Sequence, residues 1–155
     1  MEKSELIHLA RSFQEFTDEC KLEDARHKTF TNWPYDSDPK ATLTSSKLSQ
    51  CGFTMSTVDE SEPSAECVWC SKDVVFDPTD DPLSEECHRN GCPMFKYRKP
   101  EKQWSVQEMF AAVTFKKSVA AVISMVSEHR KVLENTEDET QKRIHDLLIK
   151  ANRAC

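Results

Sequence analysis

One short stretch of this chain limits what it can fold into, because it gathers soft metal ligands at regular spacing. Cys67 and Cys70 form a C-x2-C pair, and after an acidic loop Cys87, His88 and Cys92 follow within six residues. Two donors, a gap of sixteen or seventeen residues and a second donor group are typical of a tetrahedral zinc site. Chance burial of free cysteines explains the clustering less well, and no βαβ pattern supports a redox pair. The sequence therefore predicts one structural zinc ion.

Composition supports a small metal-stabilised domain. The chain has 155 residues, of which 37% are apolar and 31% are charged, so a large core is not expected. A bound metal compensates for a thin core because its binding free energy becomes folding free energy. Seven cysteines, an odd number, favour a reducing compartment over disulfide bonding. We expect a cytosolic or nuclear protein with no signal peptide or membrane span, and no role is assigned to Cys20, Cys51 or Cys155.

Charge is distributed unevenly along the chain. Residues 1–95 carry 9 basic and 19 acidic side chains, whereas residues 96–155 carry 12 basic and 8 acidic ones. Between Asp59 and Glu86 there are ten carboxylates and one cation, Lys72. Such a surface repels nucleic acid and suits a basic peptide or a free amino terminus. A solvated acidic loop without a partner is the simpler alternative.

Periodicity and turn residues predict a mixed α and β domain. Residues 4–25 have apolar positions at helical spacing, and a second, short helix is expected from Thr44 or Ser45 to Gly52. Three short antiparallel strands are expected at 53–55, 66–69 and 74–76. An aspartate cap and Pro82 predict a further helix that carries Cys87 and His88 toward the metal.

The last third of the chain is predicted to be one long helix. Residues 103–153 contain no proline or glycine, and a break is expected, if anywhere, near 135–138. A helix of about 45 residues extends roughly 65–70 Å, so its apolar seam needs a partner helix or a second subunit. A hairpin folded back on itself is the alternative. The seam consists of Val119, Ile123, Val126, Leu133, Ile144, Leu147 and Ala151.

Several motifs in fixed order resemble those of a baculovirus inhibitor-of-apoptosis repeat, or BIR domain. They are R-x2-T-F-x2-W-P, C-G-F, C-x2-C, D-D-P, a histidine and C-P-M-F, within residues 16–99. The resemblance implies a three-stranded sheet with short helices around one zinc held by three cysteines and a histidine. It makes Cys67, Cys70 and Cys92 ligands. It also implies an N-terminal extension at 1–15 and a partner helix at 100–155.

The fourth ligand departs from the family spacing. The usual sixteen-residue gap ends on Cys87, and His88 lies one residue further on. Both donors suit zinc, but neighbouring helical side chains diverge by about 100°, so only one is expected to bind. The family norm favours His88.

A single BIR domain followed by a long helix is similar to the survivin-like group of this family. That resemblance implies a non-enzymatic subunit of the chromosomal passenger complex, whose long helix bundles with borealin-like and INCENP-like helices and so brings an Aurora-type kinase to the centromere and the spindle midzone. It also implies a homodimer, in cytoplasm and nucleus, and recognition of a histone amino terminus phosphorylated on threonine.

For the peptide site, the resemblance assigns Lys72 to the phosphate and Asp80 to the peptide ammonium group. Phe76 takes the place of a tryptophan wall, and Val75 replaces an acidic residue. The dimer contacts would be drawn from Leu6, Phe13, Met94, Phe95, Tyr97, Trp104 and Phe110.

Two other classes of function are compatible with parts of this pattern. An inhibitor of apoptosis would hold a caspase or a tetrapeptide-like amino terminus in the BIR groove, without needing the long helix. An enzyme would need an open zinc position, but four protein donors are available here, and a RING finger would need a second zinc module.

Overall fold

The structure of the protein is a computed structural model that describes residues 22–56 and 62–153. Most of the helix expected at 4–25 therefore lies outside the described residues. The chain divides into two compact units, Met1–Lys117 and Ser118–Cys155. The first contains the small domain and the start of the last helix, and the second contains the rest of that helix.

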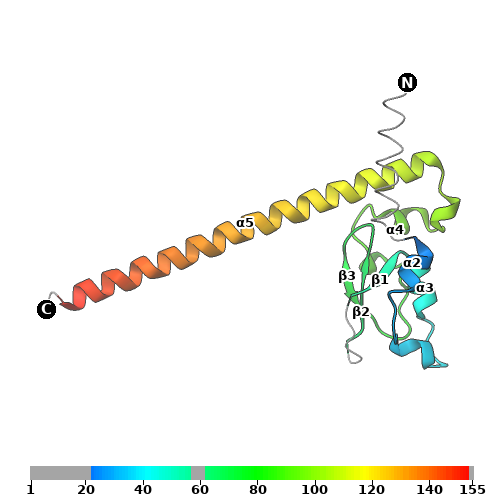
Figure 1. The fold of residues 1–155 in the computed structure, drawn as a ribbon, viewed down its shortest axis with the longest axis horizontal. Coiled ribbons are helices and arrows are strands. Elements are labelled where there is room, and N and C mark those ends of the chain that lie inside the picture. The colour runs from blue at the N-terminus through cyan, green and yellow to red at the C-terminus, as the bar shows by residue number, and fades with distance from the viewer. Residues whose placement is uncertain (1–21, 57–61, 154–155) are drawn as a thin grey trace, which may run out of the picture. The chain divides into compact units, whose positions relative to one another are not determined.

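The expected α+β class is confirmed in the first unit (Figure 1). The sheet has three short antiparallel strands in the order β1-β2-β3, with Phe53 opposite Cys67 and Ala65 opposite Val74. The helices α2 and α3 pack on each other and on β1. The elements of this unit are α2 (Glu23–His27), η1 (Pro34–Ser37), α3 (Ser45–Gln50), β1 (Phe53–Met55), β2 (Ser64–Cys67), β3 (Asp73–Val75), η2 (Glu85–Cys87), α4 (Pro93–Tyr97) and η3 (Glu101–Gln103).

Local sequence sets the ends of α3 as expected. The Thr44 hydroxyl accepts a hydrogen bond from the backbone N–H of Lys47 at 3.2 Å, which caps the first turn. Gly52 follows the helix with φ of +88°, a left-handed conformation that favours glycine. A β-carbon there would lie 2.7 Å from Cγ of Met94, so the close packing also favours a residue without a side chain.

The core is built from aromatic and cysteine side chains around the sheet. Phe53 and Phe76 pack edge to face with ring centroids 5.3 Å apart, and Trp69 and Trp104 lie 5.0 Å apart. The strand β2 begins two residues earlier than expected and ends at Cys67, and β3 begins one residue earlier. The strand β2 ends early because Val68 and Trp69 lie in the C-x2-C turn and not in the strand.

The helix expected from Pro82 onward does not form. This segment contains only the short 3-10 turn η2, and His88 follows it in an extended conformation with φ of −129° and ψ of 156°. The aspartates there cap turns instead: Oδ2 of Asp80 accepts from the Asp77 N–H at 2.8 Å, and Oδ1 of Asp81 accepts from the Leu83 N–H at 3.1 Å.

The long helix α5 runs from Val106 to Arg153 without a break, so neither the hairpin nor the interruption near 135–138 forms. Ser105 and Glu108 form a reciprocal capping box at its start, with N–H to side-chain distances of 2.7 and 3.2 Å. Hydrogen bonds from the Lys99 ammonium and from the Ser105 N–H lower the pKa of Glu108 to about 2.

The expectation that no segment approaches a membrane span in length and composition does not hold for α5. The part Val106–His145 is long and apolar enough to cross a membrane by length and composition, with a mean hydropathy of 1.5 in its most apolar window. Length and composition alone do not distinguish a spanning helix from one that buries a broad apolar face against partner helices.

Candidate metal centre and neighbouring surfaces

Four donor atoms converge from two segments that are distant in sequence. Cys67 is the last residue of β2 and Cys70 lies in the turn after it, whereas His88 and Cys92 come from the loop between η2 and α4. The four atoms all lie within 4.8 Å of one another, and all four residues are buried. Among the residues that the structure describes, this is the only cluster of at least three such donors.

The separations fit a tetrahedral zinc ion. With zinc–sulfur bonds of about 2.3 Å, two sulfur ligands of a tetrahedron lie about 3.8 Å apart. The sulfur atoms of Cys67 and Cys92 are 3.8 Å apart. Nδ1 of His88 lies 3.9 Å from Sγ of Cys70 and 3.3 Å from Sγ of Cys92. Donor type, number and spacing thus agree with a closed structural metal site.

The imidazole of His88 is oriented for metal binding. Its Nε2 lies 2.9 Å from the carbonyl oxygen of Pro82, so an Nε2–H donates to this carbonyl and the lone pair of Nδ1 faces the sulfur atoms. The ring also packs against Phe53 at a centroid distance of 5.1 Å. The extended backbone at His88 makes this arrangement possible, because a helical backbone at this residue would point the ring in a different direction.

Cys87, the alternative fourth donor, is not part of the cluster. Its Sγ accepts a hydrogen bond from the Ser84 hydroxyl at 3.1 Å and lies 3.6 Å from the carbonyl oxygen of Asp81. Burial raises the pKa of its thiol. Cys87 is a buried cysteine with local partners, and the structure brings His88 to the fourth position.

The electrostatics of the cluster favour a bound cation. Burial raises the pKa of Cys67 well above its usual value, and the hydrogen bonds that its thiol donates to Cys70 and Cys92 add to this effect. Hydrogen bonds from Cys67 and from Cys92 lower the pKa of Cys70. Sulfur atoms this close cannot all be thiolates in a buried site unless a cation compensates their charge.

A buried ion pair is hydrogen-bonded to the metal-binding turn through Trp69. The Arg26 guanidinium forms two hydrogen bonds to the Glu101 carboxylate at 2.8 and 2.7 Å, and its Nε–H donates to the Ser49 carbonyl at 2.8 Å. Trp69, which lies between Cys67 and Cys70 in sequence, donates its indole N–H to Glu101 at 2.7 Å. Sequence reasoning did not identify this network, although Arg26 opens the BIR-like motif.

Not all of the residues expected at the peptide site face solvent. The ammonium of Lys72 donates to the carbonyl of Glu86, and Asp80 is half-buried in its turn. The ring of Phe76, expected as a groove wall, is only 1% exposed and packs in the core. Val75, at 58% exposed, is the apolar side chain that this strand presents to solvent.

The strand β3 contains Val75, directly follows Lys72 and directly precedes Phe76, and it has an open edge. In the described part of the chain it pairs only with β2. Tyr35 approaches the end of this strand, where its hydroxyl donates to the Phe76 carbonyl at 2.6 Å. Burial raises the pKa of Tyr35, and the nearby carboxylates of Asp77 and Asp80 raise it further. A free edge beside acidic groups can accept an extended, basic peptide.

The seam expected on α5 is exposed wherever its side chains are described. Ile123 is 41%, Val126 54%, Leu133 70% and Ile144 53% exposed, and Val119 is half-exposed. Leu147 and Ala151 lie outside the residues whose side chains are described. A second, adjacent set of exposed apolar residues, which sequence reasoning missed, widens this face: Val122, Met125 and Val132.

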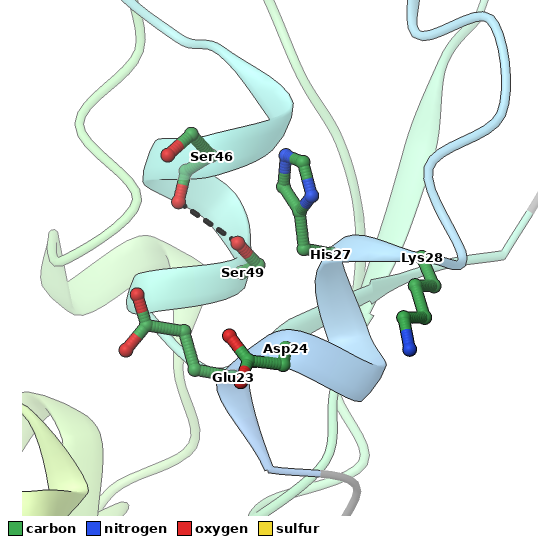
Figure 2. Close-up of a pocket in the computed structure, with 6 residues that line it drawn as sticks. All are labelled: Glu23, Asp24, His27, Lys28, Ser46 and Ser49. Carbon is green, nitrogen blue, oxygen red and sulfur yellow. Dashed lines mark hydrogen bonds between the residues drawn. The ribbon is translucent and has the colours of Figure 1, made fainter.

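A polar hollow of about 440 Å³ lies between α2 and α3 (Figure 2). Within it the Ser49 hydroxyl donates to the Ser46 carbonyl at 2.9 Å. Its acidic and imidazole groups do not form a donor cluster of the kind seen at the metal centre. The residues that line it are Glu23, Asp24, His27, Lys28, Ser46 and Ser49.

Comparison with known proteins agrees with this geometry. Residues 26–96 match the family model "Inhibitor of Apoptosis domain", BIR. The Chromosomal passenger complex protein bir-1 of Caenorhabditis elegans is 40% identical over 65 residues, covering 42% of this chain and 39% of the relative. Baculoviral IAP repeat-containing protein bir-2 of the same organism is 31% identical over 134 residues, 83% of this chain and 42% of the relative.

A third relative is matched over nearly its full length. Baculoviral IAP repeat-containing protein 5 of Mus musculus, a survivin, is 25% identical over 128 residues, which is 81% of this chain and 89% of the relative. The chain therefore spans less than half of the two worm relatives and most of the mouse one. Residues 26–96 of this chain thus match the BIR family model, and the chain is related to survivin over most of its length and to bir-1 over 65 residues.

Proposed function

We propose that this chain is a non-enzymatic, zinc-stabilised adaptor of a chromosomal passenger complex, with one surface for a peptide tail and another for partner helices. Zinc is held by Cys67, Cys70, His88 and Cys92 and has no open position for substrate. In this proposal the protein acts at the centromere and the spindle midzone, where it brings an Aurora-type kinase to its substrates through INCENP-like and borealin-like partners.

The observation that carries the proposal is the uncovered apolar face of α5. A large apolar side chain moved from water into a helix interface contributes about 1.5–3 kcal/mol, and at least five such positions lie along one face. With Arg130, Glu137 and Thr140 as polar interruptions, the seam positions alternate at three- and four-residue intervals, which is the spacing that packs one helix against others. The adjacent positions widen the face enough to contact two partners.

Disrupting this seam is expected to abolish complex formation. The Ile123→Asp/Leu133→Asp double variant places two charges in the interface, so its complex with co-expressed INCENP-like and borealin-like helical segments should be lost. Stoichiometry measured by analytical ultracentrifugation is the readout. Ser124→Asp/Lys131→Asp adds the same side chains away from the seam and should assemble like wild type. Equal assembly of the two variants, or none by wild type, would contradict the proposal.

The second surface is the open edge of β3, between Lys72 and Asp80. A phosphate would displace the neutral Glu86 carbonyl from the Lys72 ammonium, because a hydrogen bond between two charged groups is roughly twice as strong. Asp80 would receive the peptide ammonium, and Val75 would contact an apolar side chain of the peptide. Phe76 would contribute only from beneath, as part of the strand's packing.

Calorimetric titration with a histone amino-terminal peptide tests this surface. Phosphorylation of its third-position threonine is expected to tighten binding by about tenfold or more, since a hydrogen bond to a charged group contributes about 1.5–3 kcal/mol. Lys72→Ala should remove the effect of phosphate, and Asp80→Ala should weaken both peptides. Lys40→Ala removes an exposed loop cation and should change nothing. If neither peptide binds wild type, α5 is the only functional surface of this proposal.

An inhibitor of apoptosis is the second candidate, favoured by the matched domain family. It would use the same β3 edge for a caspase or for the amino terminus of an antagonist. The two candidates differ in their need for α5, because only the adaptor loses its function when the seam is charged.

A further inference from the structure

The two loops that supply the metal ligands are joined by a side chain that does not itself bind metal. Arg89 directly follows the ligand His88, and its side chain returns to the C-x2-C turn. Its Nε–H donates to the Cys70 carbonyl at 2.9 Å, and Nη2 donates to the Ser71 carbonyl at 3.3 Å. Its backbone N–H points at Sγ of Cys70 at 3.5 Å. One residue thus contacts both the ligand atom and the backbone of the opposite loop.

The turn that Arg89 holds is conformationally demanding. Ser71 has φ of +50°, a left-handed conformation that disfavours a residue with a β-carbon. The Ser71 N–H donates to the Cys67 carbonyl at 2.8 Å, which closes the turn around the two sulfur ligands. The guanidinium bonds the carbonyls of two successive residues in this turn, and its planar set of donors suits that task.

Charge gives Arg89 a second effect on the site. Zinc with three thiolates and a neutral imidazole has a net charge of −1, and the guanidinium places a cation beside it. This cation offsets the net negative charge of the zinc-loaded site. Lys72, which follows the C-x2-C turn, donates in return to the carbonyl of Glu86, two residues before His88. Each of the two loops therefore contributes one cation that bonds to the backbone of the other.

We propose that Arg89 is a positioning residue of the metal centre, which holds the C-x2-C turn against the histidine loop and slows the release of the metal. The proposal rests on zinc occupying the four-donor cluster. Mutation of a residue that hydrogen-bonds to a metal ligand typically lowers metal affinity by about 10–100-fold. Because Arg89 is exposed, we expect an effect at the lower end of that range.

The test is the rate of zinc release from the full-length, zinc-loaded chain to an excess of a chromogenic chelator. Arg89→Met keeps the apolar stem and removes both the donors and the charge, and we expect release about tenfold faster than from wild type. Arg89→Lys restores the charge but not the paired donors, and should give an intermediate rate. Arg98→Ala removes an arginine that stacks on Phe95 instead, and should release zinc at the wild-type rate.

A spectroscopic readout separates positioning from a general loss of stability. In the cobalt-substituted protein, the sulfur-to-metal charge-transfer bands should shift in Arg89→Met and return toward wild type in Arg89→Lys. Wild-type release rates in Arg89→Met, or equal acceleration in Arg98→Ala, would overturn the inference while leaving the metal centre intact. Purified wild-type protein without one zinc per chain would instead refute the metal centre itself.

Discussion

Replacing Cys70 by alanine is expected to prevent the BIR domain from folding. The binding free energy of a structural zinc is about 10–16 kcal/mol in zinc-finger peptides, which matches or exceeds the total stability of about 5–15 kcal/mol of an ordinary domain. Loss of one ligand also leaves two buried thiols and an imidazole without the charge that holds them together. The variant should lack near-ultraviolet circular dichroism, and its zinc content should fall below one per chain.

The emission of Trp69 offers a local probe of the same event. Its indole is 2% exposed and lies between two ligands, so unfolding of this turn should shift its emission to longer wavelength. Removal of zinc from wild type by a strong chelator should give the same change, reversed on adding zinc back. Retention of the native spectra by zinc-free protein would show that the core alone suffices.

The matched control for Cys70→Ala is a substitution of Cys87, the buried cysteine next to His88. Cys87→Ala removes a thiol that bonds to Ser84 and Asp81, outside the cluster, and should keep one zinc per chain with a loss of about 1 kcal/mol. His88→Ala should lose zinc as Cys70→Ala does. The reverse outcome, with Cys87→Ala losing the metal and His88→Ala keeping it, would assign the fourth ligand to Cys87.

The choice between those two donors shows where sequence reasoning stops. Ligand types and spacing predicted the cluster, because soft donors at C-x2-C spacing have few other uses. The fourth ligand depended on the backbone between Asp80 and Cys92, where two aspartates followed by a proline are typical of a helix start. In the structure the same aspartates cap tight turns, and packing against Phe53 holds His88 extended. Tertiary contacts, which a local pattern does not contain, decided the conformation.

Sequence reasoning also could not identify which side chains contact each other across long sequence separations. Phe76 was expected to form a groove wall, but the period of a short strand does not decide which of two neighbouring residues, Val75 or Phe76, faces the core. The exposed fractions of 58% and 1% settle that the aromatic ring faces inward. Arg26 and Glu101 lie 75 positions apart, and neither belongs to a pattern that predicts the other.

That ion pair leads to the second large expected effect. Glu101→Ala should lower the free energy of unfolding of the zinc-loaded protein by about 3–5 kcal/mol, because it leaves a buried guanidinium without its counter-charge. The Arg26 side chain is 0% exposed and that of Glu101 is 9% exposed. The Trp69 indole also loses its acceptor, which adds an unsatisfied donor beside the metal-binding turn. Urea unfolding followed by circular dichroism measures the change.

Two further variants separate the cost of an unpaired charge from the value of the pair. Arg26→Met/Glu101→Leu removes both charges and fills similar volume, so its stability should lie much closer to wild type than that of Glu101→Ala. Glu108→Gln removes the carboxylate of the Lys99 pair, whose side chains are 34% and 27% exposed, and should cost much less than Glu101→Gln. If Glu101→Gln and Glu108→Gln are equally mild, the buried pair does not hold the metal-binding turn to the segment before α5. If the double variant is as unstable as Glu101→Ala, the destabilisation comes from lost hydrogen bonds and packing instead of an uncompensated charge, because that variant leaves no charge to compensate.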